Sequence, residues 1–159
     1  MRRYLIVSLI CLMPLLTPCG SRQSTDPAIP AGTEQQIEQT PLAGGEFNKF
    51  FPPDSGAFEV VYSQEKEGFA QAKLKQQGAD IATLSISDTA ANPNARKKFQ
   101  ASEWMIVGYP AASSGSQGTA ILVSDRFQVQ VRAQDNALDA DEREVWLSRF
   151  DLAGLSNLE

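Results

Sequence analysis

The stretch FQVQVR, residues 127–132, alternates apolar and polar side chains more regularly than any other part of the chain. Successive side chains of a β-strand point to opposite faces, so its phenylalanine and two valines share one face and its two glutamines and arginine share the other. The stretch predicts a strand with one buried and one wet face. Residues 125–126 predict a tight turn, and residues 119–124 predict the strand before that turn.

Three more alternating stretches lie earlier in the chain, at residues 58–63, 70–75 and 82–87. A polar, glycine-terminated segment separates the first two, and Gln77-Gly78 separates the second from the third. Short turns between consecutive strands favour antiparallel pairing. These stretches therefore predict an antiparallel meander.

The segment between the two groups of strands predicts a helix and a further strand. Asn92-Pro93 places a helix-capping residue before a proline, which suits the first position of a helix, and we expect that helix to reach about Ser102 with Ala95 and Phe99 inward. Residues 104–111 predict a strand, with a bend or sheet edge at its proline. Residues 113–118 predict a loop.

The end of the chain predicts a second helix. Asp139 and Glu142 have the spacing of a capping box, in which each side chain accepts a hydrogen bond from the other residue's backbone N–H. We expect Val145, Trp146 and Phe150 to point toward the core, with three later leucines completing the packing.

The predicted order is three strands, a helix, three strands and a helix. The simplest α+β architecture for this βββα-βββα order is an antiparallel sheet of about six strands with both helices packed on one face. A closed barrel with helical plugs is the alternative.

The N-terminus has the features of an export signal. Two arginines follow Met1, and residues 4–16 form an uncharged, mostly apolar run of 13 residues. A bilayer-spanning helix needs about 20 residues, so the run is short for that role. A basic start before a short apolar core is typical of a secretory signal.

The end of this run, Leu16-Thr17-Pro18-Cys19, resembles the lipobox of bacterial lipoproteins. The resemblance implies that the thiol of Cys19 carries a diacylglycerol and that cleavage leaves Cys19 as the new N-terminus. Pro18 departs from the pattern, in which Gly, Ala or Ser usually precedes the cysteine. A plain secretory signal with a coincidental cysteine is the alternative.

Three regions follow from these features. Residues 1–18 are the predicted signal peptide, and residues 19–46 are the predicted lipid-anchored linker, because they are rich in proline, glycine and polar residues and lack apolar periodicity. Residues 47–159 are the predicted α+β domain, which opens with three phenylalanines before Pro52-Pro53.

Composition excludes several classes of function. Because Arg2 and Arg3 lie in the leader, the chain from Cys19 onward has 12 basic and 19 acidic residues. This acidic excess argues against general nucleic-acid binding, which needs a basic surface. The chain has no histidine, which removes His-based triads and His-ligated metal sites. The residues predict no cofactor and no metal site.

A few motifs remain as candidate sites. The basic residues with a possible role in binding a partner are Lys73, Lys75, Arg96, Lys97 and Lys98. The glycine- and serine-rich loop at residues 113–118 has backbone N–H groups that suit a phosphate, but it lacks the lysine of a P-loop. The acidic residues after Asp135 lack the spacing of an EF-hand. Ser63 and Lys66 match S-x-x-K, a short pattern that is common by chance.

The sequence therefore favours a non-enzymatic accessory at a membrane surface, exported and lipid-anchored, that binds a protein partner or a small ligand. An enzyme using Asp, Glu, Ser or Lys is one alternative, and a carrier of lipid or pigment is another. Through FNKFFPP, LSISDT, GYPA and AILVSDRFQVQV, the domain resembles small exported cyanobacterial lipoproteins of unknown function. That resemblance implies no activity.

Overall fold

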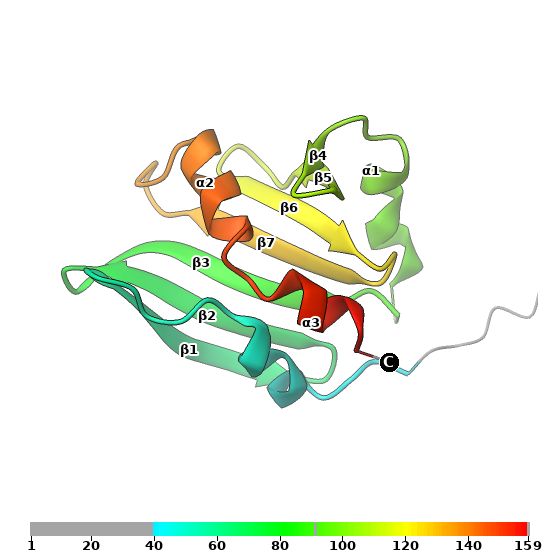
Figure 1. Ribbon diagram of the computed structural model, residues 1–159, viewed down its shortest axis with the longest axis horizontal. Helices are drawn as coiled ribbons and strands as arrows, with labels where there is room; N and C mark the ends of the chain where they lie inside the picture. Colours follow the sequence, from blue (N-terminus) through cyan, green and yellow to red (C-terminus); the bar gives the residue numbers. More distant parts are fainter. Residues whose placement is uncertain (1–39, 91, 159) are drawn as a thin grey trace, which may run out of the picture. The chain divides into compact units, whose positions relative to one another are not determined.

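A seven-stranded antiparallel sheet organises the residues that the computed structural model describes, 40–90 and 92–158 (Figure 1). The strands are β1 (Phe58–Lys66), β2 (Phe69–Gln76), β3 (Ala79–Asp88), β4 (Met105–Ile106), β5 (Tyr109–Ser113), β6 (Gly118–Val123) and β7 (Phe127–Ala133). Their order in the sheet is β1-β2-β3-β7-β6-β5-β4. Two meanders therefore meet at the antiparallel pair β3–β7.

Short helices complete the fold. They are the 3-10 helices η1 (Gly44–Phe50) and η2 (Pro93–Arg96), and the α-helices α1 (Lys97–Gln100), α2 (Ala140–Leu147) and α3 (Leu152–Ser156). The α+β class and the antiparallel sheet predicted from the sequence are confirmed. The barrel alternative is wrong, because β1 and β4 are the two open edges of the sheet in the described residues.

The predicted count of six strands is wrong by one. Residues 104–111, predicted as one strand, contain β4 and the first part of β5, which pair with each other across Val107-Gly108. Both turn residues have positive φ, 52° and 85°. Glycine adopts this conformation freely, whereas a β-branched valine rarely does. The turn could therefore not be predicted from the sequence.

The alternation predicted for residues 70–75, 82–87 and 127–132 is confirmed, whereas Tyr62 of β1, expected on the apolar side of its strand, is 48% exposed. One face of the sheet forms the main core, with Ala70, Ala72, Leu74, Leu84, Ile86, Ile121, Val123, Phe127, Val129 and Val131 all buried. Aromatic and aliphatic side chains from η1, α2 and α3 cover this face: Phe47, Phe50, Phe51, Trp146, Leu147, Phe150, Leu152 and Leu155. The expectation for Val145 is wrong, since it is 51% exposed.

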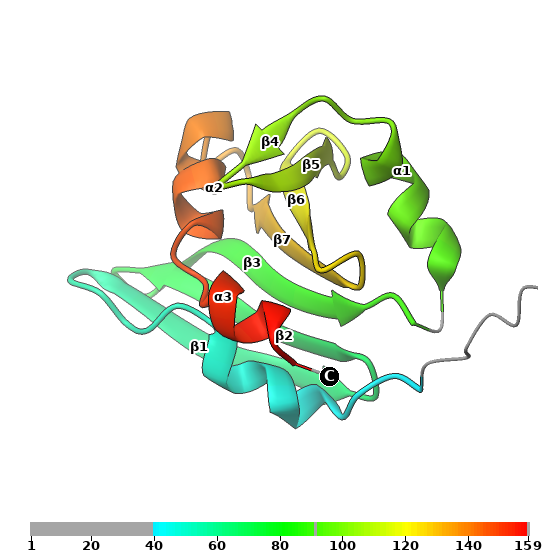
Figure 2. The ribbon, with the colours of Figure 1, turned by 45° about the vertical axis from the view of Figure 1, so that its right-hand side comes forward.

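The two predicted helices do not share one face of the sheet. The segment predicted as a helix after Asn92 forms η2 and α1, and Phe99 of α1 packs against Ala120, Leu122 and Ala112. In β6, residues 121 and 123 face the main core, so residues 120 and 122 face the opposite side. The segment therefore covers the reverse face, as Figure 2 shows. A helix with one buried phenylalanine cannot cover the main core.

The capping box predicted for the last helical region is confirmed. The Asp139 side chain accepts a hydrogen bond from the Glu142 N–H, and the Glu142 side chain accepts one from the Asp139 N–H. The region is divided, however, because Asp151 caps a separate helix, α3. Both helices pack on the main core face.

The residues just before position 47, which the sequence assigns to the linker, contact the domain. Leu42 packs against the main core, and Gly44 is buried against the β1–β2 hairpin. Residues 19–39 of the predicted linker and the whole predicted signal peptide lie outside the described residues.

Candidate binding surface

The reverse face of the sheet is polar over β2, β3 and β7. Pairing register places Gln71, Ser85 and Gln130 in one row across these strands. Lys73, Thr83 and Arg132 form the next row. Antiparallel sheets commonly keep one face in water, and here α1 covers the neighbouring strands β5 and β6. We call the two rows and the adjoining part of α1 the open face.

Two of the predicted partner-binding residues are neutralised locally. The ammonium groups of Lys73 and Lys75 lie 2.5 Å and 2.7 Å from the Asp80 carboxylate. Hydrogen bonds from Lys73 and then Lys75 lower the pKa of Asp80. A β-bulge between Leu74 and Lys75 allows both lysines, which are two residues apart, to reach the same carboxylate.

The three consecutive basic residues of the η2–α1 segment diverge. Arg96 bonds to the Asp125 backbone oxygen at 2.9 Å and to its carboxylate at 3.3 Å. Lys97 forms no ion pair with any described residue. The Lys98 ammonium lies 4.9 Å from the centroid of the Phe99 ring. Burial, and secondly the positive charge of Arg132, lower the pKa of Lys98.

Arg132 is the residue that the sequence did not single out. It lies in the same row as Lys73, pairs in register with Gly118, and acts electrostatically on Lys98. Its position on the wet face follows from the alternation of residues 127–132, but its neighbours depend on sheet order. Of the predicted partner-binding residues, Lys73, Lys75 and Arg96 are paired with carboxylates. Lys97 and Lys98 have no such partner among the described residues.

The predicted loop at residues 113–118 lies beside Arg132. A Cβ added to Gly115, which has φ +73°, would be 3.5 Å from Nη1 of Arg132. The Ser114 hydroxyl donates to Oε1 of Gln130 at 2.9 Å. The loop closes through hydrogen bonds from Ser114 N–H to the Gly118 oxygen and from Ala133 N–H to the Gln117 oxygen.

The acidic segment borders a pocket rather than a metal site. A cavity of about 320 Å³ lies between α2 and the start of β1, lined by Phe58, Gln76, Ala137, Leu138, Asp139, Asp141, Glu142, Val145, Trp146 and Arg149. Two of its carboxylates already cap α2. In the part of the chain that the structure describes, no three Cys, Asp or Glu side chains are placed to hold a metal ion.

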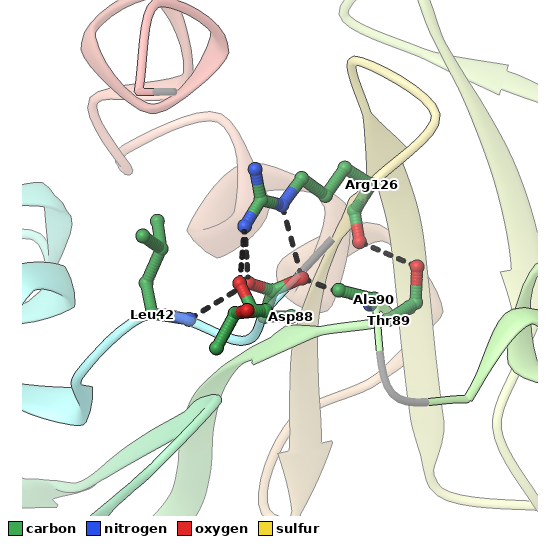
Figure 3. Close-up of polar contacts among 6 residues, drawn as sticks. Leu42, Asp88, Thr89, Ala90 and Arg126 are labelled. Atoms are coloured by element: carbon green, nitrogen blue, oxygen red, sulfur yellow. Dashed lines mark hydrogen bonds and ion pairs between the residues drawn. The ribbon is translucent and has the colours of Figure 1, made fainter. Parts of the chain in front are cut away.

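Asp88 and Arg126 form a buried ion pair at the other end of β7 (Figure 3). Nε and Nη2 of Arg126 donate to the two carboxylate oxygens at 3.1 Å and 2.8 Å. The carboxylate also accepts from the backbone N–H groups of Leu42 and Ala90, while Arg126 donates to the Thr40 oxygen. The pair therefore clamps the chain where the described residues begin.

The S-x-x-K residues do not converge. The Ser63 hydroxyl donates to the Gln71 oxygen, whereas the Lys66 ammonium lies over the Phe69 ring. Neither contact activates a nucleophile.

Cys19, the predicted lipidation site, lies outside the described residues. Among residues 40–90 and 92–158, no helix has the length and apolar character needed to cross a bilayer. No protein-family model matches the chain, and no curated protein or solved structure is significantly similar to it.

Proposed function

We propose that the chain is an exported lipoprotein, held at a bilayer through Cys19, whose domain binds a partner without catalysing a reaction. The observation that carries the proposal is the open face of the sheet. It presents polar side chains beside Arg132 and Lys98, and no described carboxylate pairs with either cation.

The position of the clamp supports this arrangement. Asp88 and Arg126 hold the chain just before β7, and Arg132 lies six residues after Arg126, near the other end of that strand. At about 3.4 Å per residue, the two points are roughly 20 Å apart. The clamp and the basic end of the open face therefore lie near opposite ends of β7.

The packing of the core argues against a carrier of lipid or pigment. Leu84 and Val129 are fully buried, and Trp146 packs edge-to-face on Phe58 with ring centroids 5.1 Å apart. These side chains fill the interior between the sheet and the helices. The cavity of about 320 Å³ beside α2 is lined by Asp139, Asp141, Glu142 and Arg149 as well as by apolar side chains, which suits a purely apolar cargo poorly.

The test combines mass spectrometry with site-specific cross-linking in membranes. We expect an N-terminal diacylated Cys19 in the membrane fraction and release of the Cys19→Ser variant. A photo-cross-linking side chain at Thr83, on the open face, should give an adduct of defined mass. The same side chain at Ser148, exposed beyond α2, should give none. An unmodified Met1 on a soluble product, or equal adducts from both positions, would overturn the proposal.

A further inference from the structure

The geometry points to an oxyanion-binding site on the open face, formed by Arg132, Lys98 and the loop at residues 113–118. It takes a tetrahedral anionic group, a phosphate or a sulfate, either free or carried on a lipid headgroup. This inference names the ligand class for the binding role proposed above and rests on that proposal for its biological purpose.

Arg132 has unused hydrogen-bonding capacity. A guanidinium carries five N–H donors in a planar fork that matches the oxygens of phosphate and sulfate. Within residues 40–90 and 92–158, no acceptor takes any of these donors, and no carboxylate lies within ion-pair distance. By contrast, Arg96, Arg126 and Arg143 each donate to a protein oxygen.

A second cation lies close to the first. Phe99 seats α1, which carries Lys98, on Ala120 and Leu122 of β6. The β6 partner of Arg132 is Gly118, two residues before Ala120. Burial, and secondly the positive charge of Arg132, lower the pKa of Lys98. Two neighbouring cations without a counterion repel each other, and a bound anion would remove that repulsion.

The loop supplies further donors. Its backbone lies directly beside the guanidinium, since a Cβ at Gly115 would be in ordinary van der Waals contact with Nη1 of Arg132, at 3.5 Å. The backbone N–H groups of Gly115, Ser116 and Gln117 donate to no described backbone acceptor. Consecutive free N–H groups next to a cation are a common way to bind phosphate.

Titration of the purified full-length chain tests the site. We expect phosphate to raise the melting temperature above that in chloride by more for the parent than for Arg132→Gln. Phosphate stabilises any folded protein through exclusion from its surface, and binding adds stabilisation only where the site is intact. Arg132→Gln and Lys98→Gln should each weaken apparent affinity by about tenfold or more, the effect of losing one charge-assisted hydrogen bond. Lys97→Gln removes the same charge from the same helix and should stay within about twofold of the parent.

A pair of substitutions at Gly115 tests the geometry without removing a cation. Asp and Asn both tolerate the positive φ of this position. Gly115→Asp should place a carboxylate against Arg132 and abolish the phosphate effect, while Gly115→Asn should retain it. Equal loss in both variants, an equal effect of Lys97→Gln and Arg132→Gln, or no difference between phosphate and chloride would overturn the site.

Vesicles distinguish the two sources of the anion. Any lipid anchor contributes equally to the chain's affinity for phosphatidylcholine vesicles and for vesicles containing phosphatidylglycerol. A difference between the two affinities therefore reports recognition of the headgroup. Stronger binding to phosphatidylglycerol vesicles that depends on Arg132 assigns the site to a lipid headgroup. Stabilisation by phosphate with no preference for phosphatidylglycerol vesicles assigns the site to a soluble anion. These measurements need neither acylation of Cys19 nor a protein partner. They therefore test the anion site even if the chain is not a tethered, partner-binding lipoprotein.

Discussion

Asp88 is the buried charged residue of the described chain, and its environment explains why it remains ionised. Burial raises the pKa of its carboxyl, but hydrogen bonds from Arg126 and from the N–H groups of Ala90 and Leu42 lower it further, so the net shift is downward. The side chain of Asp88 is 0% exposed and that of Arg126 is 13% exposed. Solvent therefore screens this pair far less than the surface pairs.

We expect Asp88→Asn to lower the free energy of unfolding by about 3–5 kcal/mol, because removing one partner leaves the other charge buried and unpaired. Asp125→Asn is the matched control: the Asp125 side chain is 69% exposed in its pair with Arg96. Exposed pairs contribute about 0–1 kcal/mol. Urea unfolding of both variants measures the difference, and equal losses would contradict the role assigned to the clamp.

The same carboxyl makes a prediction about pH. A group whose pKa is lowered by folding stabilises the protein above its unfolded pKa, about 3.9 for Asp, and loses that contribution as the pH falls through its folded pKa. The difference in unfolding free energy between the parent and Asp88→Asn should be constant from about pH 5 to 8 and shrink below about pH 4. Other carboxyls titrate in both proteins and cancel. A difference that grows toward acid would be the wrong sign.

At the scale of single elements, η1 packs closely on the backbone of the β1–β2 hairpin because Gly44 has no side chain, and not because Gly44 needs a positive φ. A Cβ on Gly44 would overlap the backbone oxygens of Lys66 and Phe69, whereas one on Gly45 would meet only Oε2 of Glu65 at 3.5 Å. Gly44→Ala must push η1 away from the β1–β2 hairpin and should cost about 1–3 kcal/mol. Gly45→Ala should change stability by less than about 0.5 kcal/mol. Thermal unfolding compares the two, and similar melting temperatures would show that η1 is not docked as described.

The β4–β5 hairpin stores strain at Val107. This residue is β-branched, has φ 52° and is 60% exposed, so its conformation gains nothing from burial of its own side chain. Val107→Asn should stabilise the protein by about 0.5–1 kcal/mol, since asparagine accepts positive φ. Val145→Asn, at a 51% exposed helical position, should not stabilise it. Unfolding free energies from urea titration of both variants check this, and a destabilised Val107→Asn protein would indicate that the turn differs.

Local sequence patterns predicted most elements but not their partners. The alternation of residues 127–132 identified a strand and its buried face, because period two depends only on neighbouring residues. The reverse position of α1 was not predicted, although residues 120–123 are apolar without alternation, a pattern typical of a strand buried on both faces. The pairing of β3 with β7 joins residues far apart in the chain, and no local pattern specifies it. Arg132 was missed for this reason.

On the scale of the whole molecule, the core is shared between the two meanders. Leu84 of β3 faces Ala72 of β2 on one side and Val131 of β7 on the other. Trp146, which follows the second meander, packs on Phe58 of the first strand. The helices on this face extend over strands of both meanders (Figure 1). Neither half retains a closed core without the other.

Unfolding should therefore be a single cooperative transition. Leu84→Ala removes a fully buried side chain at the seam and should cost about 2–5 kcal/mol. In urea, the unfolding midpoints of Leu84→Ala should fall by the same amount whether they are followed by tryptophan fluorescence or by far-ultraviolet circular dichroism. The reason is that both meanders lose the same packing. Thr83→Ala, the neighbour on the open face, should shift both by less than about 1 kcal/mol. Separate fluorescence and dichroism midpoints in the parent protein would mean that the two meanders fold independently, and the seam would then be an interface rather than a common core.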